Sequence, residues 1–202
     1  SGLGEALAQA EGRFTAANPH SKVRHERACN TLPAGHSRQT LYYPPFPLTI
    51  VSGRGARNTD LDGHEYLNLV GDYAAGVFGH SCEPIQQAVM AAMQSGVSLS
   101  GLNLRELELA ELITRRIPSI EQVRFCNSGS EACLFASLLA RHATQRRKLM
   151  VFNCCYHGGF MIYGSTDPAL SVPFSLVKAT FNDIEGTRAT LRSNATDIAA
   201  VI

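Results

Sequence analysis

Apolar residues recur at two different spacings along the chain, and the first change comes near residue 48. Residues 4–16 are rich in alanine and predict a helix that ends before Pro19, and a second helix is expected over residues 21–30. From residue 48 to 69 short apolar runs alternate with turn residues, and Asp62-Gly63 between β-forming residues is typical of a hairpin. This part of the pattern predicts two helices followed by a small antiparallel meander.

After residue 83 helical and strand patterns alternate. Pro84 opens an amphipathic helix, and a second one begins after Asn103 and ends at Pro118. Strands are then expected at 122–126, 149–153, 175–179 and 198–202, with helices at 130–143 and 183–192. Such alternation predicts crossover connections and a mainly parallel α/β/α sheet, with ligands at the carboxyl ends of its strands. Because the last strand pattern runs to the final residue, we expect a truncated domain.

Composition and charge exclude several classes of partner. The 202 residues are 45% hydrophobic and 17% charged, with a formal net charge of +1, so no strong field recruits nucleic acid. No stretch approaches the roughly 20 apolar residues of a membrane span, and the N-terminus lacks the features of a signal peptide. We expect neither a nucleic acid nor a membrane as a partner.

The cysteines and acidic motifs do not predict a metal site. The six cysteines are irregularly spaced and form no C-x-x-C pair, which suits a reducing compartment and a cytoplasmic protein. Cys154, Cys155 and His157 lack the separated ligand pairs of structural zinc, so small buried thiols are favoured. The acidic turn that begins at Asp60 lacks the glycine and glutamate positions of a calcium loop. No metal is expected.

The main candidate site is the stretch Ser128-Gly129-Ser130-Glu131, where a strand pattern changes to a helix pattern. A helix that begins there directs free backbone N–H groups and the positive end of its dipole at one point, which favours an anion such as phosphate. The same residues also match a Ser-x-x-Glu capping box, which satisfies helix amides without any ligand. The local pattern permits both interpretations.

Two further candidates lie on loops. Tyr156 and His157 follow the next predicted strand, at the same edge of a parallel sheet as Ser128, although Tyr156 can equally be a core or rim tyrosine. Arg38 lies in a loop before a proline-rich run and is either solvated or a clamp for a carboxylate, which the guanidinium fork can bind bidentately.

These motifs, in this order and at these separations, resemble the class III pyridoxal-phosphate transaminases of fold type I. The resemblance is to the branch that contains glutamate-1-semialdehyde aminomutase and the β-amino-acid transaminases, and it runs from about residue 32 to residue 202. It rests on Leu-Pro-Ala-Gly-His-Ser-Arg (32–38), Gly-Arg-Gly-Ala-Arg-x-x-Asp-x-Asp-Gly-x-x-Tyr (53–66), Gly-His-Ser (79–81), Arg-Phe-Cys-Asn-Ser-Gly-Ser-Glu-Ala (124–132) and Tyr-His-Gly-Gly (156–159).

The resemblance implies a domain organisation and a set of roles. Residues 1–82 would contribute to the small domain, and residues 83–202 would form part of the large domain that binds pyridoxal 5′-phosphate. Ser128, Gly129 and Ser130 would hold the cofactor phosphate, Tyr156 would stack on the pyridine ring beside His157, and Arg38 would bind the substrate carboxylate. A homodimer is also implied.

The implied reaction moves an amino group between an amino acid, specifically a β-amino acid, and a 2-oxo acid. The alternatives are the intramolecular amino shift of the semialdehyde aminomutases and a truncated protein without catalysis. None of the three lysines, Lys22, Lys148 and Lys178, matches the position of the family's Schiff-base lysine. The sequence therefore offers no catalytic residue, and we expect this chain to be inactive by itself.

Overall fold

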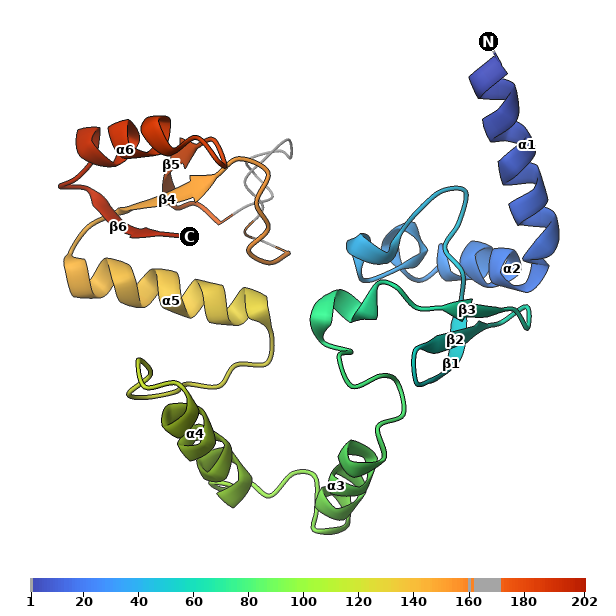
Figure 1. Ribbon diagram of the computed structural model, residues 1–202, viewed down its shortest axis with the longest axis horizontal. Helices are drawn as coiled ribbons and strands as arrows, with labels where there is room; N and C mark the ends of the chain where they lie inside the picture. The colour runs from blue at the N-terminus through green and yellow to red at the C-terminus, as the bar shows by residue number, and fades with distance from the viewer. Residues whose placement is uncertain (1, 160, 162–171) are drawn as a thin grey trace. The chain divides into compact units, whose positions relative to one another are not determined.

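The computed structural model describes residues 2–159, 161 and 172–202, which form two compact units (Figure 1). The first unit spans Ser1–Gly101 and the second spans Leu102–Ile202. The division between small and large domains expected at residues 82 and 83 concerns the organisation of a complete enzyme, and it stays a prediction.

The first unit contains the two predicted N-terminal helices and the predicted meander. The strands pair in the order β1-β2-β3 and are antiparallel throughout. The elements are α1 (Gly2–Ala17), α2 (Pro19–Ala28), the short 3-10 helices η1 (Pro33–Gly35) and η2 (Gln39–Leu41), β1 (Ile50–Arg54), β2 (Arg57–Asp60), β3 (Glu65–Leu67), the 3-10 helix η3 (Gly71–Ala74) and α3 (Glu83–Gln94).

Two aspartates of the β2–β3 hairpin have structural roles: Asp62 joins the hairpin to α2, and Asp60 holds the hairpin itself together. Asp62 accepts hydrogen bonds from the backbone N–H groups of His20 and Ser21, at 2.7 and 3.0 Å, and so caps a helix about forty residues earlier in the chain. Asp60 is 1% exposed and accepts bonds from the backbone of the hairpin, from Nδ1 of His64 and from the hydroxyl of Tyr66. The hairpin therefore fixes the start of α2 through side chains and not through its strands.

The second unit contains the parallel sheet. Its strands lie in the order β5-β4-β6, and both pairs are parallel. The elements are α4 (Leu104–Arg116), α5 (Gly129–Thr144), β4 (Lys148–Phe152), β5 (Ser175–Ala179), α6 (Ile184–Ser193) and β6 (Ile198–Val201).

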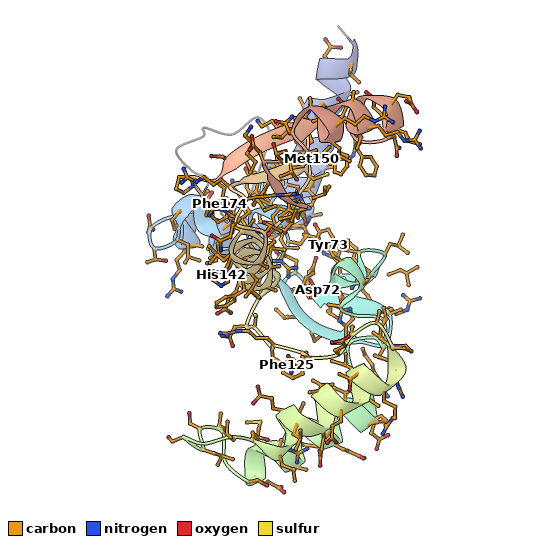
Figure 2. All side chains as sticks on the ribbon, turned by 90° about the vertical axis from the view of Figure 1, so that its left-hand side faces the viewer. Asp72, Tyr73, Phe125, His142, Met150 and Phe174 are labelled. Carbon is orange, nitrogen blue, oxygen red and sulfur yellow. The ribbon has the colours of Figure 1, made fainter. Side chains whose placement is uncertain are left out.

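Helices cover both faces of this sheet (Figure 1). Met150 in the centre of β4, labelled in Figure 2, packs with Ala179, Ile198 and Leu191 of α6. Its neighbour Val151 faces the other way and packs in the cluster that contains Leu134 of α5. Both β4 residues have no exposed surface, as expected for a parallel strand that is covered on its two faces. The predicted α/β/α arrangement is confirmed.

The strand predicted at residues 122–126 is wrong. Residues 123–126 are irregular, and no strand among the described residues pairs with them. An apolar run becomes a strand only where a neighbour supplies ladder hydrogen bonds, and that neighbour is not visible in the local pattern. The other predicted strands and helices are present with ends displaced by a few residues at most.

Within the described residues, no helix combines the length and the apolar character that crossing a bilayer requires.

We expect Asp60→Asn to destabilise the first unit by about 2–3 kcal/mol, because the amide group faces donors that then lack an acceptor. Burial alone would raise the pKa of Asp60, but the hydrogen bonds from His64 and Tyr66 outweigh it and lower that pKa below its ordinary 3.8. The stabilisation by Asp60 is therefore complete above its unfolded pKa and is lost as the pH falls through the lower folded pKa.

Urea unfolding at pH 7 measures the destabilisation by Asp60→Asn, and the same measurement at pH 3 shows how much of the Asp60 contribution is lost at low pH. Glu65→Gln is the control, since Glu65 forms an exposed ion pair with Arg57 and its loss changes stability by about 0.5 kcal/mol at most. Equal stabilities of Asp60→Asn and the control at pH 7 would contradict the assignment.

Candidate functional site

The start of α5 is a capping box, as the sequence predicts. Ser128 has extended backbone angles, and its hydroxyl oxygen accepts a hydrogen bond from the backbone N–H of Glu131 at 3.2 Å. The carboxylate of Glu131 in turn accepts a bond from the N–H of Asn127 at 2.7 Å. These reciprocal bonds fix the direction in which the chain enters the helix.

The capping box leaves two amides available. The N–H groups of Gly129 and Ser130 have no acceptor among the described residues, whereas those of Glu131 and Ala132 are satisfied by Ser128. Ser128 and Gly129 are exposed, so these donors are open to solvent. Two free amides at the positive end of a helix dipole can donate to an anion, so the capping interpretation and the anion interpretation are compatible here.

The loop after β4 closes one side of this site. The N–H of Gly159 donates to the hydroxyl oxygen of Ser130 at 3.1 Å. Gly158 has a positive φ of 118°, and a Cβ added there would lie 2.7 Å from Cα of Ser130, which is too close. At Gly159, by contrast, an added Cβ would meet nothing within 4 Å. The structure thus brings residues 128–130 and 158–159 together, although the strand expected before residue 128 is absent.

The two ring side chains of this loop have different environments. Tyr156 is 64% exposed and is therefore not a core tyrosine in this unit. His157 is half-buried, and that burial lowers its pKa, which keeps the imidazole neutral at neutral pH.

Arg38 belongs to the first unit and is not a freely solvated side chain. Its Nη1 donates to Oδ1 of Asp72 at 2.8 Å, and its guanidinium carbon lies 5.8 Å from the ring centroid of Tyr73. Both side chains of the pair remain about half exposed. The sequence did not predict the pairing of Asp72 with Arg38, because the two residues lie 34 positions apart. The one local hint is that Asp72 is an acid that follows a glycine in a Gly-rich stretch.

No group of three or more histidine, cysteine or acidic side chains in the described part of the chain has the geometry to hold a metal ion. All six cysteines are free thiols. The acidic turn that resembles a calcium loop has a structural use, since its two aspartates bind the hairpin and the start of α2.

Comparison with known proteins identifies the family. The family model for class III aminotransferases matches residues 40–194. The β-phenylalanine transaminase of Variovorax paradoxus is 46% identical over 200 residues, which cover 99% of this chain. The crystal structure of that Variovorax enzyme has a TM-score of 0.94 over 98% of the chain.

Two other relatives agree with this result. A glutamate-1-semialdehyde 2,1-aminomutase from Chloroherpeton thalassium is 37% identical over 88% of the chain. A solved transaminase with pyridoxal phosphate bound is 33% identical and has a TM-score of 0.82 over 91% of the chain.

The chain spans about half the length of the curated relatives it matches, 46% for the Variovorax enzyme and 45% for the aminomutase. The fold, the matched family model and these identities lead to one conclusion. The chain belongs to the class III aminotransferase family, for which pyridoxal 5′-phosphate is the indicated cofactor.

Proposed function

We propose that the complete protein is a transaminase that uses pyridoxal phosphate to move an amino group from a β-amino acid to a 2-oxo acid. The observation that carries this proposal is the pair of free amides of Gly129 and Ser130 at the start of α5, closed on one side by Gly158. The β-amino-acid substrate is supported by the 46% identity to a β-phenylalanine transaminase.

The residues at the start of α5 fit a phosphate group. The amides of Gly129 and Ser130 would donate to its oxygens, and the helix dipole favours its negative charge. The hydroxyl oxygens of Ser128 and Ser130 already accept bonds from the backbone, so each hydroxyl proton is left to donate outward. A side chain at position 158 would collide with Ser130, so glycine is needed there for the loop after β4 to lie against the phosphate-binding residues.

Tyr156 and His157 would serve the ring of the cofactor. The exposed face of Tyr156 offers the planar apolar contact that an aromatic ring needs for offset stacking. His157 adds no charge at neutral pH because its burial lowers its pKa. When bound, pyridoxal phosphate withdraws electrons from the substrate carbon that carries the amino group and makes its C–H acidic.

Arg38 would bind the carboxylate of the substrate. It uses Nη1 for Asp72, so among the described residues its Nε and Nη2 donors have no acceptor and can take a carboxylate bidentately. A guanidinium is permanently charged, so this recognition does not depend on pH in the neutral range.

The proton transfer requires a lysine that this chain does not offer. Lys22 pairs with Glu26 at 3.8 Å, Lys148 pairs with Asp197 at 2.9 Å, and Lys178 lies within β5. We therefore infer that the 202 residues alone can bind the phosphate of the cofactor but cannot catalyse transamination.

A homodimer and a cytoplasmic location complete the proposal. The homodimer is supported by α3, which has no buried residue. Between 48% and 60% of the surface of its apolar residues Ile85, Val89, Met90 and Met93 is exposed. The cytoplasmic location is supported by the six free thiols.

Gly158→Ala should weaken retention of pyridoxal phosphate by the complete protein by about tenfold or more, since the added methyl displaces Ser130 and its amide. Cofactor absorbance after dialysis measures the retention. Gly159→Ala is the matched control, because its methyl group enters open space. Equal retention by the two variants would show that Gly158 does not shape the cofactor site.

Transamination is tested by adding a β-amino acid and a 2-oxo acid to the complete protein and following both products. We expect Arg38→Ala to raise KM for the β-amino acid by about 10- to 100-fold, which corresponds to the loss of charge-assisted hydrogen bonds to one carboxylate. Arg57→Ala, which removes another exposed arginine that pairs with an acid, should leave KM unchanged. Turnover of a semialdehyde substrate without any 2-oxo acid would instead establish the aminomutase reaction.

A further inference from the structure

We propose that Asp72 is a positioning residue for Arg38, and that the η3 turn exists to hold Asp72 and Tyr73 against the loop that carries this arginine. The proposal rests on the carboxylate-binding role of Arg38 in the proposed function. Three contacts, between residues 38–40 and residues 72–73, support it.

These contacts hold Arg38 from two directions. Asp72 accepts from Nη1 at 2.8 Å, and the Tyr73 ring lies against the guanidinium at 5.8 Å. The hydroxyl of Tyr73 then donates to the carbonyl of Thr40 at 3.0 Å, which ties the same turn to the backbone of the Arg38 loop. Figure 2 labels Asp72 and Tyr73, which come from this one turn. An arginine held by an acid at one edge and a ring on one face loses most of its rotamer freedom before a ligand arrives.

The turn that presents these side chains has an unusual backbone. Asp72, Tyr73 and Ala74 all have positive φ angles, of 48°, 55° and 76°. L-residues seldom adopt this left-handed region, and three in succession persist only where the surroundings impose them. A relaxed turn would direct the side chains of Asp72 and Tyr73 elsewhere, so the strain has a consequence at Arg38.

The turn is held in place by Asn68 and, through it, by the Gly-Arg-Gly and Gly-His-Ser motifs, which have no role in the proposed cofactor site. Asn68 accepts hydrogen bonds from the N–H groups of Val70 and Gly71, and its Nδ2 lies 2.9 Å from Nε2 of His80. His80 is seated over Gly53, where a Cβ would lie 2.7 Å from its ring. The Gly-Arg-Gly and Gly-His-Ser motifs thus anchor the turn through Asn68.

One residue of this arrangement, Asp72, lies at the wall of a cavity. Asp72, Asn68 and His80 line a cavity of about 580 Å³ within the first unit, together with apolar side chains that include Leu41, Val51 and Val70. Because Asp72 engages only Nη1, its carboxylate and that of a ligand can occupy opposite edges of the guanidinium.

The test uses Asp72→Gly and Asp72→Asn in the complete holoenzyme. Glycine accepts the positive φ and removes the carboxylate, whereas asparagine tolerates that φ and keeps an acceptor for Nη1 without the charge. We expect Asp72→Gly to raise KM for a β-amino acid by about five- to tenfold with kcat within about twofold, and Asp72→Asn to show a smaller rise. KM for an amine donor without a carboxylate should not change. Calorimetric binding of 3-phenylpropanoate should weaken in parallel.

Two controls separate positioning from a general structural effect. Glu65→Gln breaks a pair of similar length and exposure in the same unit, 2.9 Å between Arg57 and Glu65, and should leave KM unchanged. In an Arg38→Ala background, Asp72→Gly should add nothing, because it acts through Arg38.

The possible failures are distinguishable. If Arg38→Ala raises KM but Asp72→Gly leaves it unchanged or lowers it, Asp72 is not a positioning residue and the proposed function stands. If Arg38→Ala itself leaves both KM and 3-phenylpropanoate binding unchanged, the carboxylate role of Arg38 fails, and the role of Asp72 fails with it. An equal effect of Asp72→Gly with and without Arg38 also overturns the proposal.

Discussion

The site at α5 depends on which amides of the helix the protein satisfies and which it does not. Every helix begins with N–H groups that lack intrahelical acceptors. Here Ser128 satisfies two of these groups, at Glu131 and Ala132, and those of Gly129 and Ser130 have no acceptor in the part of the chain that the structure describes. Because the reciprocal bond from Asn127 to Glu131 stiffens the entry to the helix, the two open donors hold a fixed direction without any ligand. A capping box and the proposed anion site are thus parts of one arrangement.

Both units use glycine to bring backbone close to a functional group. Gly158 allows the loop after β4 to touch Ser130, and Gly53 allows His80 to lie on β1. Gly79, with a φ of 77°, approaches the carbonyl of Gly55, to which the N–H of His80 donates at 2.9 Å. Glycine is needed at these positions for a steric reason, because any side chain there would push apart the two segments that meet at the glycine.

The sequence predicted elements more reliably than contacts. Periodicity and caps located the helices, the meander and the strands β4, β5 and β6, because these features are encoded within one element or its flanks, and the alternation of helices and strands predicted that the sheet is parallel. The sequence pattern wrongly predicted a strand at residues 123–126, where strand formation needs a partner strand from elsewhere in the chain. It also missed the bond from Asp62 to α2 and the pair between Arg38 and Asp72, which join residues 41 and 34 positions apart. The second of these also depends on positive φ angles that no propensity predicts for aspartate and tyrosine.

The groups proposed to bind the two anions are backbone amides and one guanidinium, and neither kind of donor loses its proton near neutral pH. His157 is assigned to the ring of the cofactor and not to an anion, and burial lowers its pKa. Two of the three lysines are already held in ion pairs with Glu26 and Asp197. The pH dependence of the proposed reaction would then report on the group that moves the proton, and not on the groups proposed to hold the two anions.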